Sequence, residues 1–207
     1  IELRTELIAE GAVFETTGDT EVLLRAYQIW GPGFVSRLNG MFAIAVHDTM
    51  TSQTHLYRDR LGVKPLYLAQ HQGVLFFASE IKALLAAGVE ARPNLSALAE
   101  FFALNYVPQP NTAFAGIRHL PPAHRATVSP QGIEEQAYWR LGDQHPMAMD
   151  EADAMAELSD LLDDATRIRL RSDAAFGAFL SGGLDSSAVL SAMHRHLGDG
   201  VKTYCIG

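Results

Sequence analysis

The chain has 207 residues, of which 48% are hydrophobic, and this content is enough for a large core and argues against a disordered chain. The 24 acidic and 16 basic residues give a formal net charge of -8 without a basic cluster, which argues against nucleic acid as a partner. No apolar run approaches the roughly 18 residues of a membrane span, so a cytoplasmic protein without a membrane partner is expected.

The first 80 residues predict helices followed by short strands. Apolar residues recur at helical spacing in 2–10 and again in 20–30, where Gly31 and Pro32 end the pattern. Four β-branched or aromatic runs follow, separated by turn residues, at 40–49, 53–59, 65–70 and 73–80. They are typical of an antiparallel meander, and helices packed on such a sheet give an α+β domain.

Residues 79–141 predict two more helices and a hairpin. Ser79 is expected to cap the first helix, and the second is expected over 95–107, ended by Pro108 and Pro110. Strand-like segments at 124–130 and 133–141 flank a turn that contains Gln131 and Gly132. Four aromatic residues of the first domain are expected in the core: Phe76, Phe77, Phe101 and Phe102.

The composition changes at 142–150, "GDQHPMAMD", which is the predicted linker. After a helix at 151–171, the chain reads as strand, glycine-rich turn, helix and strand, a βαβ unit of a parallel sheet. The predicted domains are 1–141, with antiparallel sheet and helices, and 151–207, the start of an α/β domain with a parallel sheet.

The two ends of the chain and its cysteine carry further expectations. Because the sequence starts at Ile1 within a helical pattern and stops within a strand, an internal fragment of a longer protein is expected. A single cysteine excludes an internal disulfide and a cysteine-rich zinc site, and Cys205 is expected to be a buried thiol in a reducing compartment.

The stretch "SGGLDSS", residues 181–187, lies where the strand of the βαβ unit turns into its helix. In open parallel sheets ligands bind at this turn, where free backbone N–H groups and the helix dipole favour an anion. Gly182 and Gly183 allow phosphate oxygens to approach, and Asp185 fits beside them if Mg²⁺ bridges the two. The alternative is that the glycines turn the chain while Asp185 or Ser186 caps the helix.

"FLSGGLDSS" resembles the pyrophosphate-binding loop S-G-G-x-D-S of the ATP pyrophosphatases, and residues 173–193 are similar to glutamine-hydrolysing asparagine synthetases in particular. The resemblance implies ATP and Mg²⁺, with Asp185 as a ligand of the metal. It also implies a set of ATP-binding residues, the last of them against adenine: Leu180, Ser181, Gly182, Gly183, Leu184, Asp185, Ser186, Ser187 and Ile206.

The first domain resembles the same family at separated places. "TTGDTEVLLRAYQIWG" resembles the segment T-x-[SG]-D-x-E-V, whose aspartate, here Asp19, binds glutamine in the amidotransferase pocket. A carboxylate suits this role because it can pair with the ammonium of a free amino acid. The alternative for Asp19 is a helix N-cap. Segments as far as residue 139 extend the resemblance to class II amidotransferases with an N-terminal nucleophile.

These amidotransferases share the pattern R-D-x-x-G-x-x-P-L, which is met by Arg58, Asp59, Gly62, Pro65 and Leu66. The five residues are expected to be structural. Gly62 suits a turn that needs a positive φ, and Arg58 is expected to form an internal ion pair with Asp59.

The resemblance implies synthesis of asparagine: ATP converts aspartate to aspartyl-AMP with release of pyrophosphate, and ammonia from glutamine displaces AMP. Glutamine, aspartate and ATP are the expected small-molecule partners, and a homodimer is left open. The family's nucleophilic cysteine and its Asn-Gly oxyanion pair fall outside the chain, so no catalytic residue is assigned. The fragment alone is expected to be inactive.

Two alternatives to asparagine synthesis remain open. One is an asparagine-synthetase-like amide-forming or cyclising enzyme with another acceptor, and the other is a non-catalytic assembly module. His194 and His196 are two residues apart on a helix and are expected to be a surface pair rather than a metal site. Surface ion pairs are expected among the charged residues of the helix at 151–171: Asp163, Asp164, Arg167, Arg169 and Arg171.

Overall fold

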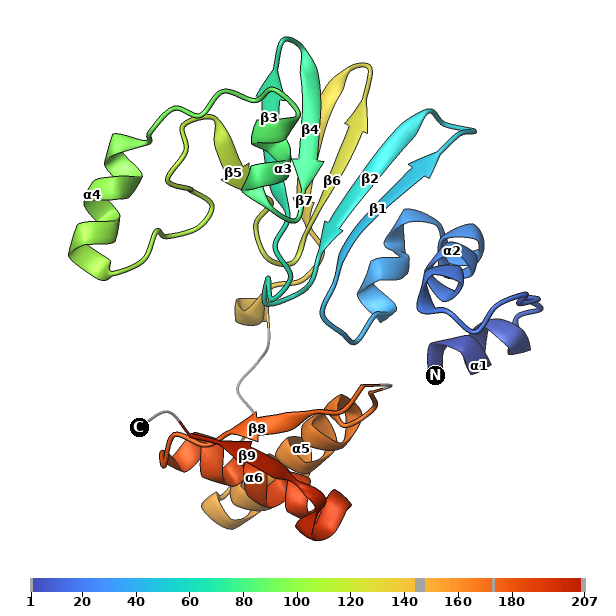
Figure 1. The fold of residues 1–207 in the computed structure, drawn as a ribbon. Coiled ribbons are helices and arrows are strands. Elements are labelled where there is room, and N and C mark those ends of the chain that lie inside the picture. Colours follow the sequence, from blue (N-terminus) through green and yellow to red (C-terminus); the bar gives the residue numbers. More distant parts are fainter. Residues whose placement is uncertain (1, 144–147, 173, 206–207) are drawn as a thin grey trace. The chain divides into compact units, whose positions relative to one another are not determined.

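The computed structural model describes residues 2–143, 148–172 and 174–205 (Figure 1). Contacts along the chain divide it into two compact units, the first ending at residue 144 and the second starting at residue 145. In the described part of the chain, no helix is both long enough and apolar enough to cross a bilayer.

The first unit begins with three helical segments, α1 (Glu2–Ala9), α2 (Asp19–Trp30) and the 3₁₀ helix η1 (Gly31–Arg37). The two predicted helices are confirmed. They pack through an apolar cluster in which Leu7 of α1, Ala26 of α2 and Phe34 of η1 are fully buried. Tyr57 joins this cluster from a strand, so the helices are anchored to the sheet beside them.

The strands of the first unit form two antiparallel sheets rather than one meander. The four-stranded sheet has the order β1 (Ala43–Asp48), β2 (Gln53–Arg58), β6 (His124–Ser129) and β7 (Gly132–Ala137). The three-stranded sheet has the order β4 (Val74–Ala78), β3 (Tyr67–His71) and β5 (Ile117–His119). The hairpins β1–β2, β3–β4 and β6–β7 agree with the predicted segments, but β2 pairs with β6 and not with β3.

Arg58 and Asp59 explain why the chain leaves the first sheet after β2. The predicted ion pair between them is wrong, because neighbouring side chains at a strand end point in opposite directions. The Arg58 guanidinium donates instead to the carbonyl oxygens of Gly62, Lys64 and Leu120 and to the Gln109 side chain, at 2.7–2.9 Å. The Asp59 carboxylate accepts from the backbone N–H groups of Leu61, Val63 and Lys64 at 2.9–3.2 Å. These contacts fold residues 59–64 into a compact turn that leads into the other sheet.

Two short helices lie between the strands, α3 (Ile81–Ala86) and α4 (Leu95–Leu104). The predicted Ser79 cap is wrong, because Glu80 is the N-cap residue of α3 and no side chain caps it. Asn94 caps α4 by accepting from the Ala97 N–H at 3.3 Å. The helix ends at Leu104, three residues before its predicted end, because Asn105 adopts a left-handed conformation with φ 62° and closes the last turn.

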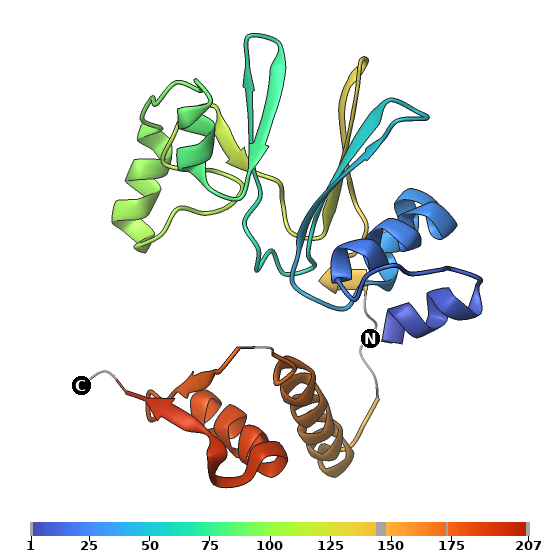
Figure 2. The same ribbon diagram turned by 45° about the vertical axis from the view of Figure 1, so that its right-hand side comes forward.

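The helix α4 lies beyond the three-stranded sheet, on the side away from the four-stranded sheet (Figures 1 and 2). The prediction that its aromatic residues belong to the core is therefore wrong: Phe101 is exposed and Phe102 is 84% exposed. Phe77 of β4 is also exposed, whereas its neighbour Phe76 packs against a buried cluster under α3. Strand alternation sends these two neighbours to opposite faces of the sheet.

The second unit contains α5 (Glu151–Arg169), β8 (Gly177–Phe179), α6 (Leu184–Leu197) and β9 (Lys202–Tyr204). The strands β8 and β9 are parallel, so the predicted βαβ unit is confirmed. Asp150 caps α5 by accepting from the Asp153 N–H at 2.9 Å. Cys205 follows β9 and is exposed, which corrects the prediction of a buried thiol.

Candidate functional site

The turn from β8 into α6 and the first turn of α6 contain all but one of the predicted ATP-binding residues, over 180–187. The Leu180 N–H donates to the Tyr204 carbonyl at 2.9 Å and extends the pairing with β9 beyond the end of β8. Gly182 then takes a φ of +78°, in the left-handed region that favours glycine. This turn brings the chain into α6, whose first backbone N–H groups have no helical partners.

Three serine hydroxyls make hydrogen bonds within this turn. The hydroxyls of Ser186 and Ser187 both donate to the Gly183 carbonyl, at 3.1 and 2.8 Å, and Ser181 lies 3.1 Å from the Ser186 hydroxyl. All three are on or near the surface. A hydroxyl group rotates freely about its C–O bond, so these donors can turn toward a ligand at the start of α6.

Asp185 lies in the first turn of α6 and is exposed. The alternative in which Asp185 or Ser186 caps this helix is wrong, since Gly183 is the N-cap residue and no side chain makes a cap hydrogen bond. Within the described ranges, the Asp185 carboxylate has no hydrogen bond or ion pair with another side chain. It is therefore available to a ligand.

The residues around Asp185 fit a magnesium ion shared with phosphates. In the part of the chain that the structure describes, no three His, Cys, Asp or Glu side chains come together to hold a metal. Mg²⁺ in nucleotide sites is commonly held by one or two carboxylates together with substrate phosphates. The exposed Asp185 carboxylate could supply the protein ligand of such a site, and phosphates bound at the neighbouring turn could supply the others.

A cavity of about 480 Å³ adjoins the loop, and Leu180 and Ser187 are among its lining residues. Val201 and Thr203 line it from the β9 side. Of the predicted ATP-binding residues, Ile206 lies outside the described residues, so its expected contact with adenine stays a prediction.

The other predicted site residue, Asp19, is the first residue of α2. The alternative of an N-cap is wrong, because Gly18 occupies that position and no side-chain hydrogen bond caps the helix. Asp19 is exposed, and no hydrogen bond of its carboxylate is found among residues 2–143. A carboxylate at a helix N-terminus is stabilised by the helix dipole, and here it faces no competing partner.

Sequence reasoning missed two residues that hold the segment before Asp19. Glu21 binds the backbone of Glu15 and Thr16, and Arg4 binds the carbonyls of Thr16 and Gly18. Glu21 is part of the quoted pattern T-x-[SG]-D-x-E-V, but the pattern alone does not say what it contacts. The position three residues into a helix, typical of a capping box, was the available signal.

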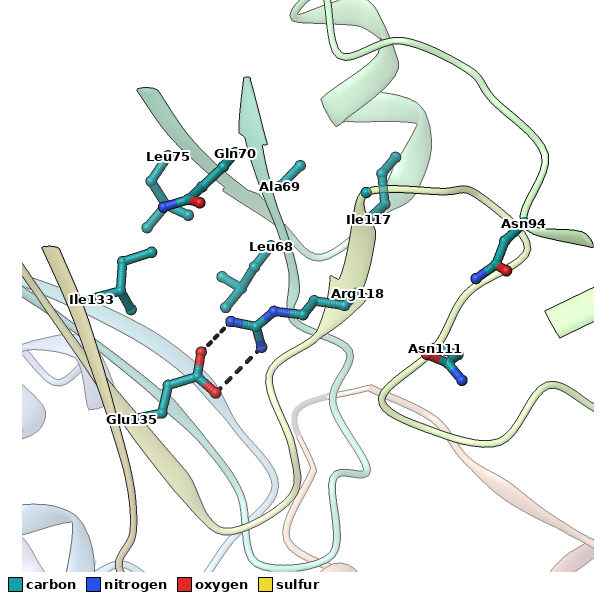
Figure 3. Close-up of a pocket in the computed structure, with 11 residues that line it drawn as sticks. Leu68, Ala69, Gln70, Leu75, Asn94, Asn111, Ile117, Arg118, Ile133 and Glu135 are labelled. Atoms are coloured by element: carbon teal, nitrogen blue, oxygen red, sulfur yellow. Dashed lines mark hydrogen bonds and ion pairs between the residues drawn. The ribbon is translucent and has the colours of Figure 1, made fainter. Parts of the chain in front are cut away.

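A second cavity, of about 760 Å³, lies between the two sheets of the first unit (Figure 3). Arg118 of β5 and Glu135 of β7 form an ion pair across it. None of the predicted site residues lines this cavity.

Two family models match the chain. A model described as glutamine amidotransferase domain matches residues 1–139, and one described as asparagine synthase matches residues 157–207. A solved structure described as glutamine phosphoribosylpyrophosphate amidotransferase from B. subtilis aligns with 99% of this chain and 42% of its own, with 16% identity and a TM-score of 0.45. That likeness is too low to carry an argument.

Similar sequences include curated asparagine synthetases. Asparagine synthetase [glutamine-hydrolyzing] 3 of Bacillus subtilis is 41% identical over 198 residues, covering 94% of this chain and 32% of that protein. Asparagine synthetase [glutamine-hydrolyzing] 1 of the same organism is 34% identical over 208 residues, covering 100% and 33%. The chain thus spans about a third of the length of the curated relatives that it matches. With the amidotransferase model over most of its length and the synthase model after it, the chain belongs to the family of glutamine-hydrolysing asparagine synthetases.

Proposed function

We propose that the protein containing this chain makes asparagine from aspartate, with ATP to activate aspartate and glutamine to supply ammonia. The observation that carries the proposal is the presence of both parts in one chain. An amidotransferase segment contains the exposed Asp19, and a synthase segment contains residues 181–187, which form the turn after a parallel strand and the first turn of the next helix. The proposal includes a cytoplasmic location, with glutamine, aspartate and ATP as substrates.

Residues 181–187 would bind the pyrophosphate part of ATP. The N-terminus of α6 offers backbone N–H groups and a positive dipole end to an anion. The hydroxyls of Ser186 and Ser187, now bound to the Gly183 carbonyl, can turn and donate to phosphate oxygens. Asp185 would hold Mg²⁺. When bound, this ion neutralises charge on the phosphates as pyrophosphate leaves.

The reaction in this half would form and break two bonds in turn. A carboxylate oxygen of the aspartate side chain bonds to the α-phosphorus of ATP, and the bond from that phosphorus to pyrophosphate breaks. Ammonia then bonds to the carbonyl carbon, AMP leaves, and a proton is lost to give the amide. The contribution of this chain is to hold the pyrophosphate and to stabilise its charge as it departs.

Asp19 would bind glutamine in the other half. Its carboxylate is exposed, has no partner among residues 2–143, and suits the ammonium group of a free amino acid. The proposal for this residue is therefore substrate binding and not proton transfer or nucleophilic attack.

The D185A variant of the intact protein tests the proposal. We expect aspartate-dependent exchange between ATP and pyrophosphate to fall by at least about a hundredfold, the scale on which removal of a charge-stabilising group acts. Glutamine hydrolysis should be unchanged. D160A is the matched control, because Asp160 is an exposed aspartate on α5.

The outcomes separate the parts of the proposal. Exchange retained in D185A would refute the proposed role of Asp185. A different result would be that the unmodified protein exchanges pyrophosphate only with a carboxylic acid other than aspartate, and that D185A loses this exchange. That result would identify a relative with another acceptor.

A further inference from the structure

The Glu21 side chain is turned back from α2 toward the preceding loop. It is only 12% exposed. Its carboxylate accepts from the Glu15 N–H at 2.9 Å, from the Thr16 N–H at 2.7 Å and from the Thr16 hydroxyl at 2.7 Å. Arg25, one turn further along α2, lies 3.4 Å from the same carboxylate. Glu21 is therefore a side chain with three donors from one short segment.

This arrangement differs from an ordinary capping box. In a capping box the glutamate three residues into a helix binds the N–H of the N-cap residue. Here the N-cap residue is Gly18, and Glu21 reaches two and three residues further back. It thereby ties the segment 15–18 to the first turn of the helix. The hydrogen bonds, that from the Thr16 hydroxyl first, lower the pKa of Glu21 to about 2, so the carboxylate is charged at any physiological pH.

Arg4 of α1 holds the same segment from its carbonyl side. Its guanidinium donates to the Thr16 carbonyl at 2.9 Å and to the Gly18 carbonyl at 3.1 Å, and it stacks on the Phe14 ring at 4.2 Å from the centroid. The N–H groups of the segment thus bind Glu21, and its carbonyls bind Arg4. Gly18, which directly precedes Asp19, is fixed by the second of these contacts.

Asp19 has no such contact of its own. Its carboxylate makes no hydrogen bond with the described residues, so its position depends on how the backbone enters α2. We infer that Glu21 is a positioning residue for glutamine binding: it holds the segment 15–18 so that Asp19 presents its carboxylate to the substrate. This inference rests on the proposed role of Asp19.

The E21Q variant of the intact protein tests the inference. Glutamine keeps the size of the side chain but replaces one accepting oxygen by an NH2 group, which can only donate. We expect KM for glutamine to rise about tenfold, as for a loss of about 1.4 kcal/mol in binding, with kcat for glutamine hydrolysis unchanged. Synthesis from added ammonia should also be unchanged, because it does not use the glutamine pocket.

Two further variants control for the substitution itself and for loss of folding. In E90Q the same change is made at an exposed glutamate whose partner is Arg92, and all kinetic constants should stay the same. In T16V the hydroxyl donor is removed while Glu21 is intact, and KM for glutamine should rise by a smaller factor. T16V keeps the inference testable if E21Q does not fold.

A double-mutant cycle with D19N shows whether Glu21 acts through Asp19. If it does, the D19N/E21Q protein has the same KM as D19N alone, because the positioning of a missing carboxylate no longer matters. Multiplicative effects of the two changes would overturn the inference, as would an unchanged KM in both E21Q and T16V when D19N has a raised KM. An unchanged KM in D19N itself would instead overturn the assigned role of Asp19 and, with it, the inference.

Discussion

Gly62 is held in a turn where no other residue fits well. Its φ is +64°, and a Cβ atom added to it would lie 2.8 Å from Cγ of Pro122 and 3.1 Å from Cζ of Arg58. Both neighbours are fixed, since Pro122 is a ring and Arg58 is bound by four acceptors. The positive φ that the sequence pattern predicted is confirmed, and the structure adds the close packing.

We expect G62A to lower the free energy of unfolding by roughly 2–4 kcal/mol, from strained φ together with overpacking. G73A is the matched control. Gly73 also has a positive φ, +77°, but its added Cβ would meet nothing within 4 Å, so about 1 kcal/mol is expected. Urea denaturation of the two variants measures the difference. Equal losses in G62A and G73A would mean that the contacts with Pro122 and Arg58 relax at no cost.

The residues Arg58 and Asp59 show what the sequence could not predict at this scale. Adjacent opposite charges in an apolar stretch suggest an ion pair. Sequence adjacency does not specify the directions of the two side chains, and each of them is satisfied by backbone groups brought from as far away as Leu120. The same reasoning applies to Glu21, whose partners lie before the helix and not on it.

At the scale of elements, hydrophobic periodicity located most helices and strands but not the partners of the strands. The segments of β1 to β4 were predicted, yet β2 pairs with β6, which is far along the chain. A strand carries no local signal for such a partner. The three-residue β5 was missed because it lies within a segment rich in proline, asparagine and glycine, and it forms only by pairing with β3.

The helices α5 and α6 are joined at Asp163. One oxygen of its carboxylate accepts from Nε of Arg195 at 2.8 Å, and the other lies 2.9 Å from Nε2 of His196. The sequence predicted partners for Asp163 on its own helix. Of the predicted pairs, Asp164 does bind Arg167 one turn away, but Asp163 reaches across to the next helix. It therefore links two elements.

We expect D163N to lower the midpoint of thermal unfolding of the chain at pH 7, with D160N on the same exposed helix as the control. The hydrogen bond from Arg195, first, and the nearby charges lower the pKa of Asp163 below its usual value of 3.8. The contribution of the Asp163 contacts to stability is therefore present above pH 3.8 and is lost as the pH falls through the lowered pKa of the folded state. Circular dichroism melts at pH 7 and pH 3 should show a difference from D163N that shrinks in acid. A difference that persists at pH 3 would contradict an electrostatic origin.

At the scale of the whole molecule, the sequence indicated where the two candidate binding segments lie along the chain but not the contacts around them. Residues 181–187 and the start of α2 could be located because each combines a strand or helix signal with residues of a recognisable pattern. The supporting contacts of Glu21 and Arg4 could not, since they depend on how α1 returns to α2. The exposed apolar face of α4 was likewise read as core, because an apolar run in sequence does not say what covers it.

The division into two compact units leads to a prediction for the 207-residue chain. The proposed domains are 1–141 and 151–207, and the contacts divide the chain between residues 144 and 145. Proteases cut first where the backbone is exposed and few contacts cross the cleavage point. We therefore expect brief digestion with a protease of low specificity to give two stable products whose ends, measured by mass spectrometry, fall within 142–150. First cuts within 105–116, a long segment of the first unit with no helix and almost no strand, would contradict this boundary, because the most accessible cleavage point would then lie inside the first unit.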